Sequence, residues 1–149
     1  MAKINTIAGD IYYKTDGDSL TCISWSESDN TNPSNKLDGK VKANLEEYFK
    51  NKRQKFDVPI NPQGTEFQQR VWKELLKIPY GKTVTYKDVA DAIGSHPRAV
   101  GMAVGKNPIP IIIPCHRVIG KNGKMTGFSG GEGIKTKEIL LNLEQNLQN

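Results

Sequence analysis

The sequence predicts an α+β fold, in which a small N-terminal sheet with one helix precedes a mainly helical second part. Three observations support this prediction. β-Favouring residues surround two turn signals before residue 26, helical periodicity recurs in later segments, and residues 52–64, with two prolines and a glycine, are typical of a linker. We therefore expect an N-terminal subdomain at 1–60 and a second domain at 61–149.

The composition is that of an ordinary globular protein, with 36% hydrophobic and 25% charged residues among 149. No apolar run approaches the ~20 residues that a membrane helix needs, and residues 1–10 lack the pattern of a secretion signal. We therefore expect a cytoplasmic protein without membrane contact.

The formal net charge of +5 lies mostly in the C-terminal half. Residues 1–80 hold 12 Lys and Arg against 11 Asp and Glu, whereas residues 81–149 hold 9 against 5. This excess is compatible with attraction to phosphates, although it is more often only a solubility feature. Cys22 and Cys115 are too few for a disulfide framework, and with two histidines they show no zinc-ligand spacing. We expect reduced thiols and no bound metal.

In the first part, residues 4–25 predict a small antiparallel sheet, because β-favouring residues flank turn signals at 8–10 and 15–18. Residues 26–37 are polar and predict a loop. Apolar residues recur at helical spacing over 40–50 and predict a helix that packs on the sheet.

The second part begins with a helix at Thr65, because Gln68 stands three positions later and the two residues can form a capping box. Apolar residues from Phe67 to Leu76 supply its buried stripe, and Pro79 marks its end.

Two short helices follow. Thr85 is expected to cap the first, over 86–93, which Gly94 ends. Ser95 is expected to cap the second, which continues to residue 104. Two short helices around a glycine turn are typical of a helix-turn-helix.

The second of these helices carries many small residues, Ala99, Gly101, Ala103 and Gly105. Glycine normally costs up to ~1 kcal/mol relative to alanine in a helix, so the pattern has a cause. Two explanations account for the small residues equally well. One is close packing against another helix, and the other is a smooth face that lies close to a DNA backbone or minor groove.

An aliphatic run over 109–113 predicts a buried strand that leads directly to Cys115 and His116. A histidine can activate a cysteine thiolate, directly or through a water. Taken alone, the pair favours a structural interpretation, because buried cysteines are common and neighbours on a strand point to opposite faces.

The last helix is expected over 134–147, with leucines on one face. Glu144 lies beside that face, between Leu143 and Leu147, and is a candidate to orient His116. Periodicity alone favours a solvated carboxylate at this position.

The segment Pro114–Val118, Pro-Cys-His-Arg-Val, resembles the active-site signature of the O6-alkylguanine-DNA alkyltransferases. The N-terminal sheet and helix also resemble the ribonuclease-H-like first domain of that family. The similarity extends over most of the second domain and includes Gly64–Gln68, Val71–Trp72, Ile78–Thr83, Thr85–Tyr86, Arg98–Gly101, Asn107–Pro108, Ile113–Ile119, Gly127–Gly131, Lys135, Leu140–Leu141 and Glu144.

This resemblance implies DNA repair by direct reversal, in which the alkyl group of O6-alkylguanine moves irreversibly to Cys115 without a cofactor; O4-alkylthymine stays open as a second substrate. His116 would deprotonate Cys115 through a water, and Glu144 would orient His116. Asn107 would brace the turn that holds the motif.

The implied partner is double-stranded DNA containing O6-alkylguanine, which a monomer of this protein would bind through the minor groove. In a prokaryote, such a protein would be associated with the nucleoid. Tyr86 would rotate the 3′ phosphate as the base flips, and Arg98 would fill the vacated place in the stack. Ala99, Gly101 and Ala103 would allow close approach of the second helix to the groove.

The resemblance also implies a base pocket lined by Pro110, Val118 and Ser129, with Lys135 near its wall. Phe128 stands where many members of the family have tyrosine, so a hydroxyl is absent from this pocket. Some members bind zinc through N-terminal Cys and His, and Cys22 is the only such residue before His96 here.

Three other functions compete with alkyl transfer. A damage sensor with this fold would lack the acceptor cysteine, which Cys115 argues against. A Cys-His hydrolase would need an oxyanion hole, and nothing in the sequence indicates one beyond the Cys-His pair. A sequence-specific transcription factor would carry long polar residues on its second helix, where this chain has Ala and Gly.

Overall fold

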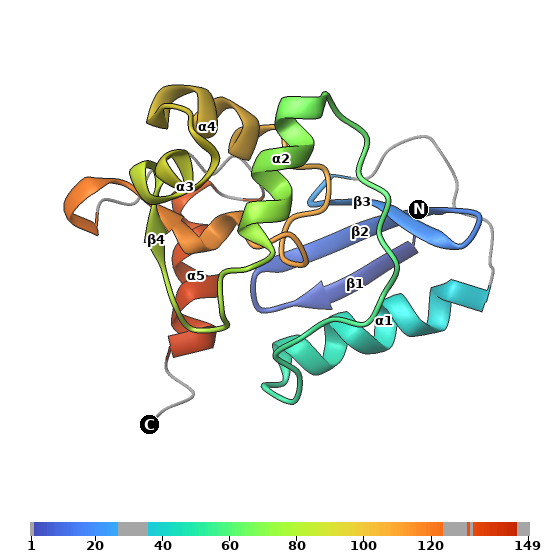
Figure 1. Cartoon of the computed structure of the whole chain (residues 1–149). Coiled ribbons are helices and arrows are strands. Elements are labelled where there is room, and N and C mark those ends of the chain that lie inside the picture. Colours follow the sequence, from blue (N-terminus) through green and yellow to red (C-terminus); the bar gives the residue numbers. More distant parts are fainter. Residues whose placement is uncertain (1, 27–35, 124–130, 132, 146–149) are drawn as a thin grey trace.

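The computed structural model describes residues 2–26, 36–123, 131 and 133–145 (Figure 1). Its N-terminal part is an antiparallel sheet of β1 (Ala2–Thr6), β2 (Gly9–Asp16) and β3 (Ser19–Ser24) in the order β1-β2-β3. Residues on β2 alternate between the core and solvent, with Ile11, Tyr13 and Thr15 buried. The predicted sheet is therefore confirmed.

Helix α1 (Lys36–Phe49) covers one face of this sheet and starts earlier than the periodicity predicts (Figure 1). Val41, Leu45 and Tyr48 are spaced about one turn apart and are all 0% exposed, so they form its inner face.

The segment predicted to be a linker also pairs with the sheet. Leu20 of β3 donates to the carbonyl of Pro59 and accepts from the amide of Asn61, both at 2.9 Å. Ile23 donates to the carbonyl of Pro108 at 2.9 Å. These bonds attach the N-terminal sheet to the helical part.

Helix α2 (Glu66–Leu75) begins at the predicted capping box between Thr65 and Gln68. Trp72 on its inner face is 1% exposed, and its indole N–H donates to the carbonyl of Ala103 at 2.9 Å. The buried indole therefore has the polar partner that it requires.

Helix α3 (Tyr86–Ile93) is capped by Thr85, as predicted, and ends at Gly94, whose φ of 69° is left-handed. Helix α4 (Pro97–Gly105) follows after a tight turn. The expected cap at Ser95 is wrong: its amide donates to the carbonyl of Ala90, so Ser95 still closes α3. The residue before α4 is His96, whose side chain makes no cap hydrogen bond.

The strand predicted over 109–113 is also wrong, although all five residues are buried. The backbone reverses direction at Ile111, whose φ is 76°, and the amide of Ile113 donates to the carbonyl of Ile109 at 2.9 Å. Prolines at 108, 110 and 114 lack the N–H groups of a strand ladder, so this aliphatic run forms a buried turn.

The remaining elements flank the segment that carries Cys115. They are the short parallel pair β4 (Val84–Thr85) and β5 (Val118–Ile119), the 3-10 turns η1 (Cys115–Arg117) and η2 (Lys121–Gly123), and helix α5 (Ile134–Gln145). The buried apolar side chains of both parts form one continuous cluster. Within the described ranges, every helix is too short or too polar to cross a membrane.

Candidate active site

Cys115 is the first residue of η1, directly after the buried aliphatic turn, and is 6% exposed. Asn107 holds that turn from inside. Its side-chain N–H donates to the carbonyl of Ile113 at 2.8 Å, while its Oδ1 accepts from the amide of Ile109 at 2.9 Å. Two side-chain bonds thus maintain the unusual backbone before the cysteine.

Burial raises the pKa of the Cys115 thiol to about 11, although a hydrogen bond from Asn107 and the charge of Lys137 act in the opposite direction. The resting side chain is therefore a protonated thiol at neutral pH. A base must take its proton before the sulfur can act as a strong nucleophile.

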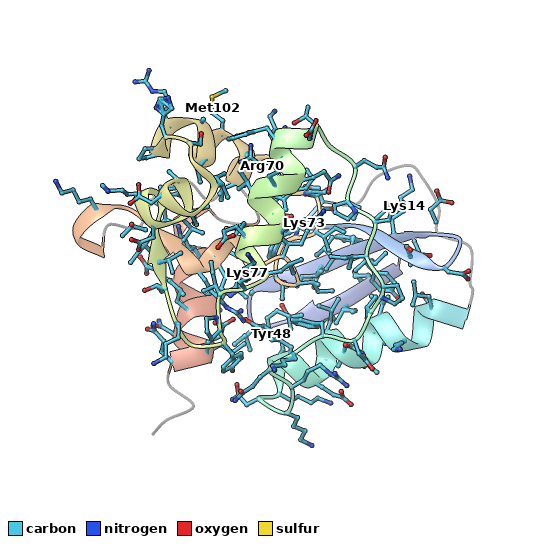
Figure 2. All side chains as sticks on the ribbon, viewed as in Figure 1. Lys14, Tyr48, Arg70, Lys73, Lys77 and Met102 are labelled. Carbon is cyan, nitrogen blue, oxygen red and sulfur yellow. The ribbon has the colours of Figure 1, made fainter. Side chains whose placement is uncertain are left out.

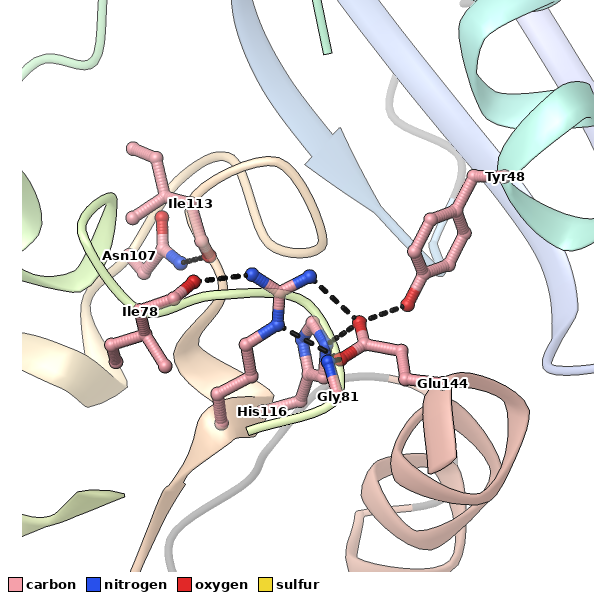
Figure 3. A network of polar contacts seen from close by, with 8 residues as sticks. Tyr48, Ile78, Gly81, Asn107, Ile113, His116 and Glu144 are labelled. Atoms are coloured by element: carbon pink, nitrogen blue, oxygen red, sulfur yellow. Dashed lines mark hydrogen bonds and ion pairs between the residues drawn. The ribbon is translucent and has the colours of Figure 1, made fainter. Parts of the chain in front are cut away.

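His116 forms a fully buried pair with Glu144 of α5. Its Nε2 lies 2.6 Å from Oε2 of Glu144, and both side chains are 0% exposed (Figure 3). The pair joins the cysteine turn to the last helix, so the predicted position of Glu144 on the inner face of α5 is correct.

The Glu144 carboxylate accepts hydrogen bonds from four residues (Figure 3). Arg117 donates twice, from Nε to Oε1 and from Nη2 to Oε2, each at 2.9 Å, and its Nη1 donates to the carbonyl of Ile78 at 2.7 Å. The amide of Gly81 donates to Oε1 at 3.1 Å, and the Tyr48 hydroxyl donates to Oε2 at 2.6 Å. Burial favours the neutral acid, but the bonds and charges of His116 and Arg117 outweigh it and lower the pKa of Glu144 well below its usual range.

Burial lowers the pKa of His116 below its usual 6.5, although Glu144 opposes this change. The imidazole is therefore neutral at pH 7. Because Nε2 faces a carboxylate, we assign the proton to Nε2 and the lone pair to Nδ1. That Nδ1 is buried and has no hydrogen-bond partner among the described residues, so it is free to accept a proton.

Lys137 is a site residue that the sequence did not identify. It is 1% exposed, and its Nζ donates to the carbonyl of Val118 at 2.6 Å. Burial lowers its pKa to about 8, and the neighbouring Cys115 partly opposes the shift. Helical spacing could have revealed Lys137 as an inner-face residue, because Leu140, Leu141 and Glu144 follow it by three, four and seven positions.

Lys135, for which the resemblance implied a place near the pocket wall, has an exposed side chain. Each helical residue advances by about 100°, so positions 135 and 137 point to nearly opposite sides of α5. The helix therefore turns Lys137, not Lys135, toward Val118.

A cavity of about 780 Å³ adjoins the cysteine. The second part of the chain contributes Asn107, Pro110, Cys115 and Thr136 to its wall, and the N-terminal part contributes Tyr12, Ile23 and Trp25. Pro110, one of the residues expected to line a base pocket, borders this cavity. Phe128 and Ser129 lie outside the described residues.

The exposed face of α4 differs from the predicted smooth face. Ala103 is 3% exposed, together with Val100 and Val104, so its side chain belongs to the core. Small residues two positions apart cannot share one face of a helix that turns by about 100° per residue. The outer face instead carries Arg98 and Met102, which is 71% exposed and projects away from the molecule (Figure 2).

Tyr86 begins α3 and lies against α4. A Cβ atom added at Gly101 would stand 3.9 Å from the Tyr86 ring, so Gly101 permits ordinary contact between the two helices. The ring centroid is 5.9 Å from Nζ of Lys137. Tyr86 therefore connects the outer helices to the cysteine region.

Known proteins resemble this chain closely. A family model described as 6-O-methylguanine DNA methyltransferase, DNA binding domain, matches residues 66–146. The methylated-DNA–protein-cysteine methyltransferase of Methanosarcina barkeri is 56% identical over 104 residues, covering 68% of this chain and 65% of that protein. That of Mycobacterium tuberculosis is 55% identical over 103 residues, covering 68% and 61%. The chain thus spans less than two thirds of the length of these relatives.

Solved structures extend the similarity to the N-terminal part. The crystal structure of Mycobacterium tuberculosis O6-methylguanine methyltransferase superposes with a TM-score of 0.86 at 42% identity, over 97% of this chain and 91% of that one. The structure of the Mycobacterium tuberculosis protein in complex with DNA gives a TM-score of 0.87 at 44% identity, over the same shares. The α+β fold and the predicted family resemblance are confirmed.

Proposed function

This chain belongs to the 6-O-methylguanine DNA methyltransferase family, and we propose that it repairs DNA by moving the alkyl group of O6-alkylguanine onto its own Cys115. The observation that carries this proposal is the buried His116–Glu144 pair directly beside the cysteine, with Nδ1 of His116 left as an acceptor. A catalytic base beside a buried thiol is the arrangement that alkyl transfer to sulfur requires.

The proposed reaction begins when the Cys115 thiol gives its proton, through a water, to Nδ1 of His116. The thiolate then attacks the alkyl carbon attached to O6, so that an S–C bond forms as the C–O bond breaks. The electron pair of the broken bond leaves with the guanine, which Tyr86 protonates, and the proton on His116 can then be passed back to Tyr86 by way of solvent. Nothing in this scheme removes the S-alkyl group, so each protein molecule acts once.

The surrounding residues support the base rather than react. Glu144 holds the imidazole in the tautomer with its proton on Nε2, and Asn107 maintains the turn that presents the cysteine. The Lys137 ammonium lies close enough to influence the thiol and favours the thiolate as the proton leaves.

We assign duplex binding to α3 and α4, which would act as a helix-turn-helix within a catalytic domain at 61–149, behind a ribonuclease-H-like subdomain at 1–60. Arg98 and Met102 on the exposed face of α4 would enter the minor groove of the duplex, with Ala99 and Gly101 at the flanks of that face. Tyr86 and Arg98 would support base flipping. A monomer acting on chromosomal DNA agrees with these assignments.

Intact-mass spectrometry tests the proposal. After incubation with a duplex that contains O6-methylguanine, the protein should gain the mass of one CH2 unit, located on the peptide of Cys115. The gain should stop at one alkyl group per chain with excess duplex. A protein that binds the damaged duplex but gains no mass would be a damage sensor, and repeated turnover would exclude the irreversible mechanism.

A further inference from the structure

Tyr48 connects the N-terminal part of the chain to the proposed catalytic base. It lies on the inner face of α1, is 0% exposed, and donates its hydroxyl hydrogen to Oε2 of Glu144 at 2.6 Å (Figure 3). His116 Nε2 lies at 2.6 Å from the same oxygen. A residue of the N-terminal part, 96 positions away in sequence, thus shares the carboxylate oxygen that orients His116.

Packing fixes the Tyr48 hydroxyl in this position. The ring meets Phe49 edge-on at 5.1 Å between centroids, Phe56 at 5.4 Å and Tyr80 at 6.2 Å. Burial, followed by the charge of Glu144, raises the pKa of Tyr48 well above its usual 10. The phenol therefore remains a protonated donor throughout the pH range in which alkyl transfer would operate.

We propose that Tyr48 is a positioning residue for alkyl transfer. Its hydroxyl donates a hydrogen bond to the Glu144 carboxylate and so weakens the pull of that carboxylate on a second imidazole proton, which keeps His116 neutral and able to accept the cysteine proton. This inference rests on the proposed function. It gives the N-terminal sheet and helix a direct part in the chemistry, in addition to their contribution to the core.

Several donors share the single negative charge of Glu144. Around Glu144, the described charged and titratable groups are Arg117, His116, Tyr48 and Tyr80, with Cys115 and Lys137 beyond His116. Removing the phenol leaves Oε2 with only His116 and Arg117 as donors. The carboxylate then attracts a proton on the imidazole more strongly, which raises the pKa of His116.

The rate of alkyl transfer should follow the neutral fraction of His116 on the acid side of its pH profile. In Tyr48→Phe, the acid side of the profile should therefore move to higher pH by about half a unit to one unit. At pH values below the pKa of His116, this shift lowers the rate about threefold to tenfold. At pH 8 and above, the variant and the wild type should agree within about twofold, because both imidazoles are neutral there.

Tyr80→Phe is the matched control. The Tyr80 hydroxyl is buried near the same carboxylate but has no hydrogen-bond partner among the described residues. Its ring packs on Tyr48 and on the Arg117 guanidinium, and Phe preserves both contacts. Removal of this hydroxyl should leave the pH profile unchanged.

The experiment measures single-turnover transfer from a duplex containing O6-methylguanine to the full chain, from pH 5 to pH 9, for the wild type and both variants. The expected result is an acid side displaced only in Tyr48→Phe. Equal profiles in all three proteins, an equal displacement in Tyr80→Phe, a uniform rate loss at every pH, or failure of Tyr48→Phe to fold would each overturn the proposal.

A second readout does not depend on alkyl transfer. The chain has only two histidines, so ¹⁵N NMR can follow the titration of His116 directly. The midpoint should lie higher in Tyr48→Phe than in the wild type, and an unchanged midpoint would overturn the inference. If the wild type transferred no alkyl group while the midpoint still moved, the proposed function would fail and the coupling between Tyr48 and His116 would stand.

Discussion

The ammonium of Lys137 donates to the carbonyl oxygen of Val118 across 2.6 Å, immediately behind the cysteine turn. The Lys137 charge also lowers the pKa of Cys115 against the effect of burial. At pH 7, below its own pKa of about 8, the ammonium is charged and can stabilise a thiolate.

Lys137→Met should therefore slow the reaction of Cys115. The methionine keeps most of the length and the burial but removes the charge, so the pKa of the thiol should rise above about 11. We expect carboxymethylation of Cys115 by iodoacetate-type reagents at pH 7 to slow about tenfold. Lys135→Met, on the exposed side of the same helix, should react like the wild type, and equal slowing in both variants would exclude a local effect.

Glu144→Gln should destabilise the protein by about 3–5 kcal/mol at pH 7, because it leaves the buried Arg117 guanidinium without its counter-charge. Urea unfolding measures this difference. Glu138→Gln, an exposed change on the same helix, should alter the unfolding free energy by less than about 0.5 kcal/mol.

The stabilising effect of Glu144 should also depend on pH. The folded-state pKa of Glu144 lies far below its usual 4.5, so its contribution to stability is complete above pH 4.5 and decreases as the pH falls toward the folded-state value. The difference in unfolding free energy between the wild type and Glu144→Gln should therefore shrink below pH 4.5. A constant difference down to pH 3 would contradict a charged Glu144.

Cys115→Ser should abolish the mass gain on incubation with O6-methylguanine duplex while it leaves the duplex affinity within about twofold, because thiolate chemistry and groove contacts use different groups. Cys22→Ser is the control, since Cys22 lies on β3 and is not among the residues that line the cavity. Transfer by Cys115→Ser would falsify the assignment of the acceptor.

Arg98→Ala should slow repair in duplex DNA much more than reaction with free O6-benzylguanine, because only the duplex requires a flipped base and a filled stack. Arg98 is exposed at the start of α4, whereas Lys42 is exposed on α1, away from α4 (Figure 1). Lys42→Ala should leave both rates unchanged. Equal losses on both substrates in Arg98→Ala would remove its role in flipping.

Local chemistry made part of this protein predictable from its sequence. The capping box of Thr65 and Gln68 and the cap at Thr85 depend on residues three positions apart, so the order of residues is enough to place them. The motif around Cys115 and the role of Glu144 came from the resemblance to a known family, because periodicity alone favours a solvated carboxylate at position 144, where the structure has a buried one.

Tertiary structure decided the rest. The aliphatic run before Cys115 is buried in either conformation, and its turn at Ile111 depends on prolines and on the bonds of Asn107. The choice of Lys137 over Lys135 depends on how α5 is rotated against Val118. Tyr48 reaches Glu144 only because α1 and α5 meet in the folded chain, and no periodicity within either segment encodes a contact between them.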